Sequence, residues 1–457
     1  MIDIDPALQP GDLLPAIRRM WSISGRKIRD IENNYPAEQG SPVFTVGGKY
    51  TARGWTEWTQ GFVYGSALLQ FEAGDDSEFL DIGRRNTLEK MAVHVTHFGV
   101  HDHGFNNIST YGNLLRLLEQ GRLPEDPWQR HFYRLALKCS GAVQARRWTA
   151  LPEGGFIYSF NGPHSLFADT IRSLRVLAVA HQLGHRLRGE QEQSVSLLER
   201  LIQHARSTSR WNVYFGTGRD AFDQRGRVAH ESIFNLNNGC YRCPSSQQGY
   251  SPFSTWTRGL AWILCGFAEQ LEFLADLPDD ELEPFGGRQA VEKEFLHTAE
   301  ATADFYIEQT PTDGIPYWDT GAPNLHRLGD CLMRPAEPNN DWEPVDSSAA
   351  AIAAQGLLRL GQYLLRRNQE EAAARFRQAG LTVLRTLLQD SYLGLDPEHQ
   401  GLLLHALYHH PNGWDTVPEG SRVPNGEACI WGDYHLREVA LLTQRLAETD
   451  NHPTFYL

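Results

Sequence analysis

The feature that most constrains this chain is a helical spacing of apolar residues that returns along nearly its whole length. Apolar side chains three or four positions apart form one face of an α-helix. Strand-like alternation is confined to short pieces at 156–160 and 211–215. The pattern therefore predicts an all-α protein. The predicted helices cover 12–32, 60–73, 78–98, 127–147, 165–187, 192–207, 255–275, 290–309, 347–366, 369–388 and 432–448.

Long segments rich in Gly, Pro, Asn and aromatic residues separate groups of these helices. Their aromatic content is too high for disordered linkers, and loops of this length in a compact chain usually carry function. No low-complexity segment divides the chain. We therefore predict one domain over residues 1–457, with paired helices in a closed ring and the loops at one end. An open helical solenoid is the alternative, although strict repeats are absent. The loops are 38–57, 99–112, 149–164, 211–254, 311–345 and 410–431.

Charge and processing signals limit the partners and the compartment. The formal net charge is −14, from 42 basic and 56 acidic residues, which argues against nucleic acid as the main partner. No apolar run is long enough to span a membrane, so we expect no membrane partner. The N-terminus shows no secretory signal, and we expect a cytoplasmic protein, with a periplasmic location still open.

The cysteines do not indicate a disulfide framework or a metal site. The chain has 6 cysteines, and Cys240 and Cys243 form a lone CxxC motif without the second pair that a zinc site requires. We interpret them as loop cysteines of unknown role. We expect no bound metal and no cofactor.

Two carboxylates are the strongest catalytic candidates. Asp169 lies early in a predicted helix among apolar neighbours, where burial would raise its pKa and suit it to act as a general acid. A carboxylate favoured by the helix dipole, with a lowered pKa, explains the same position equally well. Asp102 lies in a loop between His101 and His103, where it is either a second acid or a loop cap.

Other polar residues in the long loops are candidates for ligand contacts. His101 and His103 would need a third ligand to hold a metal ion, and none is marked. His230 is either a polar site residue or a hydrogen-bonded structural histidine. Gln248 precedes a Gly-Tyr turn and could reach a ligand hydroxyl. Arg258 could clamp a carboxylate in bidentate fashion or form a salt bridge between helices.

Aromatic residues gather in the loops and at the starts of helices. As a group they suit the apolar faces of sugar rings, although each one alone is explained as a core residue. Motifs of serine hydrolases, P-loop nucleotide-binding proteins, zinc proteases and nicotinamide-dependent enzymes are absent in a supporting context. The group comprises Trp55, Trp58, Phe62, Tyr64, Trp256, Trp262, Tyr317, Trp318, Trp431 and Tyr434.

Several of these motifs, in this order, resemble the unsaturated glucuronyl hydrolases of glycoside hydrolase family 88, with the unsaturated rhamnogalacturonyl hydrolases as near relatives. The resemblance covers most of residues 50–445. It is carried by WTQGFVYG at 58–65, HDHGF at 101–105, ADTIRSL at 168–174, QGYSPFSTWTRGLAW at 248–262, DGIPYWD at 313–319, DSSAAAIAAQGLL at 346–358 and IWGDYHLREVAL at 430–441.

The resemblance implies an (α/α)6 barrel that hydrates the C4=C5 double bond of a terminal unsaturated uronic acid and so releases the rest of an oligosaccharide left by polysaccharide lyases. It implies that Asp169 is the general acid and Asp102 its carboxylate partner. His101, His230, Gln248 and the pair Arg258 and Trp262 would complete the substrate pocket. Trp58 would be a stacking wall.

The sequence departs from the family pattern on the substrate side. His103 stands where an apolar residue is usual, Pro252 and Phe253 replace polar residues, and the region around Phe160 is shortened. The identity of the uronic acid, the linkage and the need for a double bond therefore stay open. An inverting glycosidase acting on saturated sugars and a non-catalytic carbohydrate-binding protein are the alternatives. The sequence does not indicate an oligomeric state.

Overall fold

Helices dominate the structure, a computed structural model that describes residues 1–53, 58–449 and 453–457. Trp55, one of the aromatic candidates, lies outside the described residues. The helices are α1 (Leu14–Asn34), α2 (Gln60–Gly74), α3 (Ser77–Lys90), α4 (Ala92–Val95), α5 (His103–Asn107), α6 (Asn113–Glu119), α7 (Pro127–Arg146), α8 (Thr170–Ser173), α9 (Arg175–Gln182), α10 (Leu197–Asn212), α11 (Thr257–Ala275), α12 (Asp279–Leu282), α13 (Arg288–Glu308), α14 (Ser347–Arg366), α15 (Glu370–Leu387) and α16 (Ile430–Glu448).

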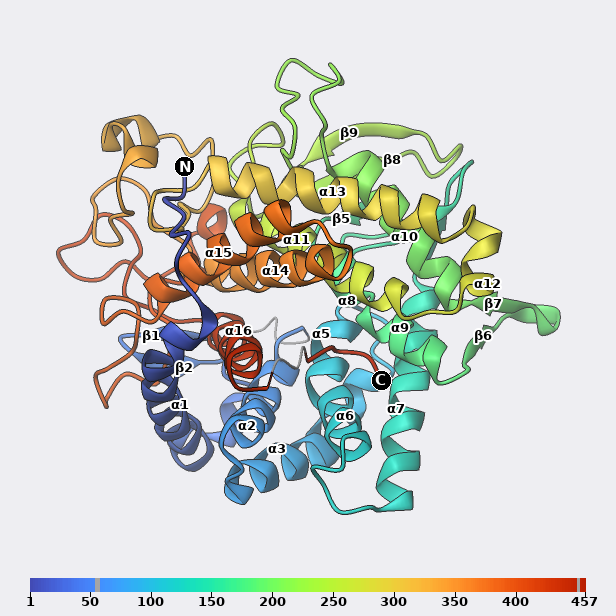
Figure 1. The fold of residues 1–457 in the computed structure, drawn as a ribbon, viewed down its shortest axis with the longest axis horizontal. Coiled ribbons are helices and arrows are strands. Elements are labelled where there is room, and N and C mark those ends of the chain that lie inside the picture. Colours follow the sequence, from blue (N-terminus) through green and yellow to red (C-terminus); the bar gives the residue numbers. More distant parts are fainter. Residues whose placement is uncertain (54–57, 450–452) are drawn as a thin grey trace.

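The long helices form two concentric rings (Figure 1). The inner ring consists of α2, α5 with α6, α8 with α9, α11, α14 and α16, and it closes because α16 packs against α2. Outer helices α1, α3, α7, α10, α13 and α15 alternate with the inner ones along the chain. This arrangement is an (α/α)6 barrel, so the predicted fold class is confirmed. The division of the chain into a single domain stays a prediction.

Most predicted helices are found within a few residues of their expected ends, and α14 shows why. Its Ala-rich first half favours helix, and the carboxylate of Asp346 caps it by accepting hydrogen bonds from the backbone N–H groups of Ser348 and Ala349 at 3.1 and 3.4 Å. Predicted as 347–366, this helix begins and ends where the sequence indicates.

One inner helix was assigned to a loop by sequence, and that prediction was wrong. Residues 103–119, overlapping the predicted loop 99–112, form α5, a π-helical turn (Ile108–Gly112) and α6. The segment HGFNNISTYGN has few apolar residues, but its polar side chains are buried against neighbouring helices. Gly61 N, for example, donates to Asn106 Oδ1 at 2.9 Å. Tertiary contacts, which periodicity does not detect, stabilise this helix.

The short strands pair in small antiparallel sheets. In the three-stranded sheet, β5 pairs with β8 and β8 with β9. β5 occupies the first residues of the predicted helix 165–187, and residues 211–215 finish α10 and continue as an isolated bridge instead of forming a strand. The strands are β1 (Phe44–Val46), β2 (Lys49–Thr51), β3 (Trp148–Ala150), β4 (Gly155–Ile157), β5 (Ser165–Phe167), β6 (Arg186–Arg188), β7 (Ser194–Ser196), β8 (Glu231–Phe234) and β9 (Tyr241–Ser245).

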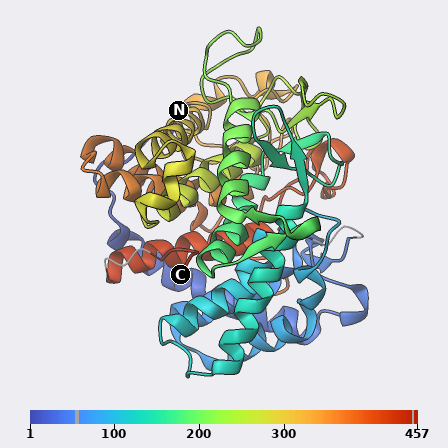
Figure 2. The same cartoon turned by 90° about the vertical axis from the view of Figure 1, so that its right-hand side faces the viewer.

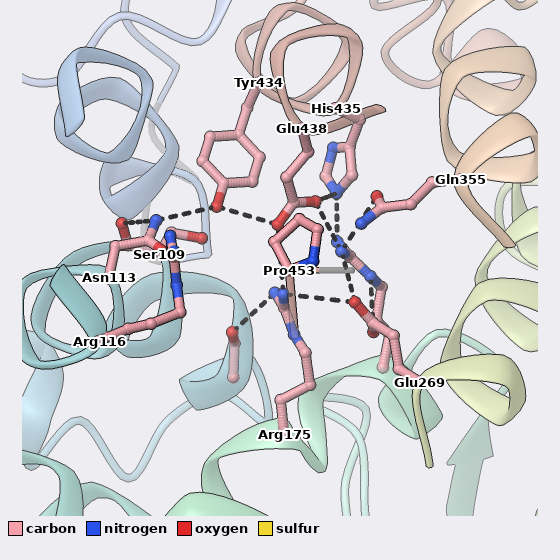
Figure 3. A network of polar contacts seen from close by, with 12 residues as sticks. Ser109, Asn113, Arg116, Arg175, Glu269, Gln355, Tyr434, His435, Glu438 and Pro453 are labelled. Atoms are coloured by element: carbon pink, nitrogen blue, oxygen red, sulfur yellow. Dashed lines mark hydrogen bonds and ion pairs between the residues drawn. The ribbon is translucent and has the colours of Figure 1, made fainter. Parts of the chain in front are cut away.

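A network of buried charges occupies the centre of the barrel (Figure 3). The Arg172 guanidinium contacts Glu269 at 3.0 Å and Glu438 at 2.7 Å, and all three side chains are almost fully buried. Arg359 reaches Glu272 at 2.8 Å, and Arg175 contacts Glu438 at 3.4 Å. Buried charges of this kind are tolerated because each lies beside an opposite charge.

The long loops gather mainly at one end of the helices, on the right of Figure 2. The inner helices begin at this end, so their N-terminal residues lie beside the loops. No helix in the described part of the chain is long and apolar enough to cross a membrane.

Candidate active site

A cavity of about 440 Å³ opens among the N-terminal ends of the inner helices. Asp102 and Asp169 hold the N-cap positions of α5 and α8, and Trp256 precedes α11. Seven of the eight residues predicted for the site line this cavity, and His230 lies behind its wall. The lining residues are Trp58, His101, Asp102, Phe105, Phe160, Asp169, Ser246, Gln247, Gln248, Trp256, Arg258, Trp262, Tyr408, His409, Asn412 and Trp414.

A close approach of α5 and α8 brings the two acids together. A Cβ atom on Gly104 would lie only 2.1 Å from the carbonyl oxygen of Ser173, so no other residue fits without moving a helix. The Ser173 hydroxyl fixes the contact by donating to the His101 carbonyl at 2.6 Å and accepting from Gly104 N at 3.0 Å. The start of α5, which carries Asp102, is thereby held against α8, which begins at Asp169.

Both carboxylates approach the same imidazole nitrogen. His101 Nε2 lies 3.1 Å from Asp169 Oδ1 and 3.7 Å from Asp102 Oδ1. The side chains of His101 and Asp102 are buried, whereas that of Asp169 is 13% exposed. The sequence prediction that Asp169 and Asp102 lie together in an aromatic cavity therefore agrees with the geometry. Their catalytic roles stay predictions.

The neighbouring charges of His101, Asp102 and Asp169 shift the pKa values of His101 and Asp169. Burial alone would raise the pKa of Asp169, but the hydrogen bond and charge of His101, with smaller contributions from His230 and Arg258, lower that pKa below its usual value. Burial alone would lower the pKa of His101, but Asp102 and the hydrogen bond to Asp169 raise it. These two shifts of pKa favour a protonated His101 beside an ionised Asp169. Of the two states considered for Asp169 from sequence, the lowered pKa applies.

The hydrogen bonds of His230 define its tautomer. Its Nδ1 accepts from the backbone N–H groups of Gln247 at 3.0 Å and Gln248 at 3.3 Å, so the proton lies on Nε2. Burial lowers the pKa of His230 to about 4, which keeps the ring neutral. The Nε2 atom is buried without a hydrogen-bond partner among the described residues. It is a donor that a bound ligand or water would satisfy.

Arg258 uses its terminal nitrogens within the protein. Nη1 donates to Asp346 Oδ2 at 2.8 Å and to the Leu407 carbonyl at 2.7 Å, and Nη2 donates to Gln248 Oε1 at 3.0 Å and the Tyr408 carbonyl at 2.8 Å. These four acceptors use the four terminal N–H groups. Arg258 thus combines the salt bridge considered from sequence with a contact that turns the Gln248 amide nitrogen toward the cavity as a donor.

Aromatic rings form the floor and one wall of the cavity. Trp262 lies 4.9 Å from Phe105 between ring centroids, and Trp58 lies 6.3 Å from Phe105 and 4.7 Å from Trp431. Trp262 also contacts the Arg172 guanidinium at 5.7 Å. These rings separate the cavity from the charged network at the centre of the barrel.

Sequence reasoning missed the segment 408–414, which contributes four lining residues. The backbone N–H of His409 donates to Asp415 Oδ2 at 3.0 Å, and Tyr408 N donates to the other carboxylate oxygen. The Trp414 ring contacts Tyr408 at 5.2 Å and is 43% exposed. The motif YHHPNGW lies at the predicted loop 410–431, and its two aromatic residues were the available signal.

The remaining candidates lie elsewhere. His103 points away from the cavity, with Nδ1 2.8 Å from Ser140 Oγ and Nε2 3.0 Å from the His97 carbonyl. Cys240 and Cys243 are exposed free thiols at the β9 hairpin. Among the described residues, no group of three or more His, Cys, Asp or Glu side chains is arranged to hold a metal ion.

The start of each inner helix contributes partial positive charge to this end of the barrel, because backbone N–H groups at helix N-termini are not paired within the helix. An anionic ligand in the cavity is stabilised by roughly 0.3–1 kcal/mol for each nearby helix end. The helix ends therefore favour an anionic group in the cavity.

Comparison with known proteins gives several relatives that match most of the chain. No family model matches the chain. An unsaturated glucuronyl hydrolase of Bacillus sp. (strain GL1) is 26% identical over 441 residues, which cover 94% of this chain and 96% of that protein. An unsaturated glucuronyl hydrolase of Formosa agariphila is 23% identical over 396 residues, covering 85% and 80% respectively.

Solved structures of unsaturated glucuronyl hydrolases have the same fold. The enzyme from Bacillus sp. GL1, described as responsible for the degradation of glycosaminoglycan, superposes with a TM-score of 0.69 at 23% identity and covers 96% of this chain and 99% of its own. The enzyme from Streptococcus agalactiae gives a TM-score of 0.69 at 20% identity, covering 100% and 99%. The resemblance inferred from the motifs is thus confirmed: over nearly its whole length the chain is similar to the unsaturated glucuronyl hydrolases.

Proposed function

We propose that the protein is a hydrolase that removes a terminal 4,5-unsaturated uronic acid from oligosaccharides by hydrating the C4=C5 bond. The observation that carries this proposal is the placement of Asp169 and Asp102 on one imidazole nitrogen, beside an aromatic cavity ringed by helix N-termini. The names of the relatives support the same substrate class.

Asp169 is proposed to deliver a proton to C4 of the enol ether. Positive charge then develops at C5 and the ring oxygen, and a water molecule attacks C5. The proton that Asp169 takes from this water replaces the one it gave to C4, so the carboxyl group is regenerated. The hemiketal formed at C5 opens and releases the remaining chain.

The proton that starts the cycle resides on His101 in the free protein, because the pKa of His101 is raised and that of Asp169 is lowered. The 3.1 Å contact between Nε2 and Oδ1 is a direct path for its transfer to Asp169. Asp102, whose Oδ1 lies 3.7 Å from the same Nε2 atom, stabilises the positive charge that develops at C5.

The substrate carboxylate is proposed to lie among the helix N-termini, with Gln248 Nε2 as a donor. His230 holds the backbone of Gln247 and Gln248 in place for this contact. Arg258 orients Gln248 through the hydrogen bond to its Oε1 atom. This role does not require Arg258 to contact the substrate. Trp58 and Trp262 supply the apolar surface for the sugar ring. A cytoplasmic location stays a prediction from the sequence.

Incubation with unsaturated glucuronyl and galacturonyl disaccharides tests the proposal. We expect the ultraviolet absorbance of the enol ether to disappear as the disaccharide is consumed. Persistent absorbance with every disaccharide would contradict the proposal. Release of an intact saturated sugar from saturated substrates would instead support the inverting glycosidase considered from the sequence.

A further inference from the structure

A second cavity, which we call the outer cavity, lies beside the catalytic one. It has a volume of about 750 Å³ and is lined chiefly by Tyr250, Trp318, Asn324, Arg327, Trp342 and Arg422. Two chain segments border both cavities. Gln248 and His409 line the catalytic cavity, while Tyr250 and His410 line the outer one. A chain leaving the catalytic cavity across these segments would enter the outer cavity.

Buried polar contacts fix the walls of the outer cavity. Glu343 is 1% exposed, and its two oxygens accept from Trp318 Nε1 at 2.8 Å and Asn324 N at 2.7 Å. Asn340 Oδ1 accepts from Trp342 N at 2.7 Å, which holds the turn that carries this ring. The cavity is therefore preformed and needs little ordering when a ligand binds.

Two guanidinium groups flank Trp342 in the outer cavity. Arg327 lies 4.7 Å and Arg422 6.0 Å from the ring centroid. Within the described part of the chain, neither guanidinium makes a side-chain hydrogen bond or ion pair. The acids at this cavity are Asp341, which is exposed, and Glu343, whose oxygens are occupied as described above. The two cations thus keep their donors for a ligand.

We propose that the outer cavity binds an anionic sugar of the leaving chain, through its carboxylate or sulfate group on Arg327 and Arg422 and its ring on the neighbouring aromatic side chains. Guanidinium groups bind carboxylate and sulfate oxygens in the same bidentate geometry. This inference rests on the proposed function, and it defines the preferred substrate as an anionic oligosaccharide longer than a disaccharide.

Chain-length dependence tests the inference. We expect kcat/KM for an unsaturated tetrasaccharide to exceed that for the disaccharide of the same polymer by about tenfold, the effect of one charge-assisted contact. In the double variant Arg327→Ala/Arg422→Ala this ratio should fall to about one, while kcat/KM for the disaccharide stays unchanged. Arg366→Ala is the matched control, because this exposed arginine ends α14 at the opposite end of the barrel. It should keep the wild-type ratio.

Substrate charge separates the possible ligands. A sulfated and an unsulfated tetrasaccharide show whether sulfate or carboxylate supplies the contact. A neutral leaving chain should show no arginine-dependent preference. A wild-type ratio near one, or a ratio that survives the double variant, would overturn the inference.

Failure of the proposed function gives a different result, namely no turnover of any substrate. In that case calorimetric titration of the wild-type protein with a saturated anionic tetrasaccharide still decides the inference. Binding that weakens about tenfold in Arg327→Ala/Arg422→Ala supports it, whereas equal binding or no binding overturns it.

Discussion

The barrel contains two buried ionic clusters that differ in how their charges are compensated. At the centre, Arg172 and Arg359 lie on glutamates from neighbouring helices, and the charges balance. At the end that carries the loops, His101 lies between Asp102 and Asp169, so two carboxylates share one imidazole. Both clusters are buried, and the second lines the catalytic cavity.

This difference in charge balance indicates that the central cluster stabilises the fold, whereas the cluster around His101 can take part in chemistry. A balanced cluster resists any change of protonation, because removing one charge leaves its partner unpaired in the interior. A cluster with excess carboxylate and a titratable histidine can move a proton at modest cost. The rings of Trp262 and Phe105 lie between the two clusters and keep their functions apart.

The largest effect is expected from substitution of Asp169, one of the two carboxylates that share His101. Asp169→Asn keeps the size of the side chain and the contact with His101 but removes the group that carries the proton to C4. We expect kcat to fall by about 10²–10⁴-fold, the usual worth of general acid catalysis. The melting temperature should stay close to that of the wild type. Steady-state kinetics and calorimetry measure both, and a kcat within a few-fold of wild type would exclude Asp169 as the acid.

The balanced cluster should respond in the opposite way. Glu269→Gln leaves Arg172 without one of its two carboxylates in a fully buried site. We expect the free energy of unfolding to fall by about 3–5 kcal/mol, as measured by urea denaturation. The kcat of the folded protein should change little.

An exposed pair gives the control for this loss. Glu294→Gln breaks the contact between Glu294, whose side chain is 48% exposed, and Arg206, whose side chain is 36% exposed. The free energy of unfolding should fall by at most about 1 kcal/mol. Equal losses of unfolding free energy in Glu269→Gln and Glu294→Gln would show that burial does not make the central ion pairs more important for stability than an exposed pair.

The sequence predicted the ring of paired helices and the gathering of its site residues, because periodicity and motif order are local properties. It missed α5 and α6, whose polar residues are stabilised by contacts such as the close approach at Gly104. It left the pKa of Asp169 undecided, since the deciding group, His101, is 68 positions away in the chain. The segment around Trp414 was also missed, because its position depends on Asp415 and Arg258.

A smaller effect is expected from substitution of Arg258, which contacts Asp346 at the start of α14 and Gln248 at the cavity. In Arg258→Lys the charge beside Asp346 stays, but a single ammonium cannot serve four acceptors in a plane. Gln248 then loses its orientation, and we expect kcat/KM to fall about tenfold, mainly through KM.

A conservative exchange outside the cavity provides the comparison. Arg206→Lys, at the exposed pair with Glu294, should leave kcat/KM unchanged. If Arg258→Lys behaved like Arg206→Lys, the orientation of Gln248 by Arg258 would not matter for substrate binding.

The smallest effect is a shift in pH dependence. Activity requires one proton on the His101 and Asp169 pair, so kcat/KM should fall as pH drops through the lowered pKa of Asp169, below its usual 3.8, and as pH rises through the raised pKa of His101, above its usual 6.5. Asp102 is the largest contribution that raises the pKa of His101. Asp102→Asn should therefore move the alkaline limb to lower pH by about one unit, whatever its effect on the maximum rate. An alkaline limb that stays in place, measured on an unsaturated disaccharide, would mean that the proton is held by a group outside the carboxylate-rich cluster.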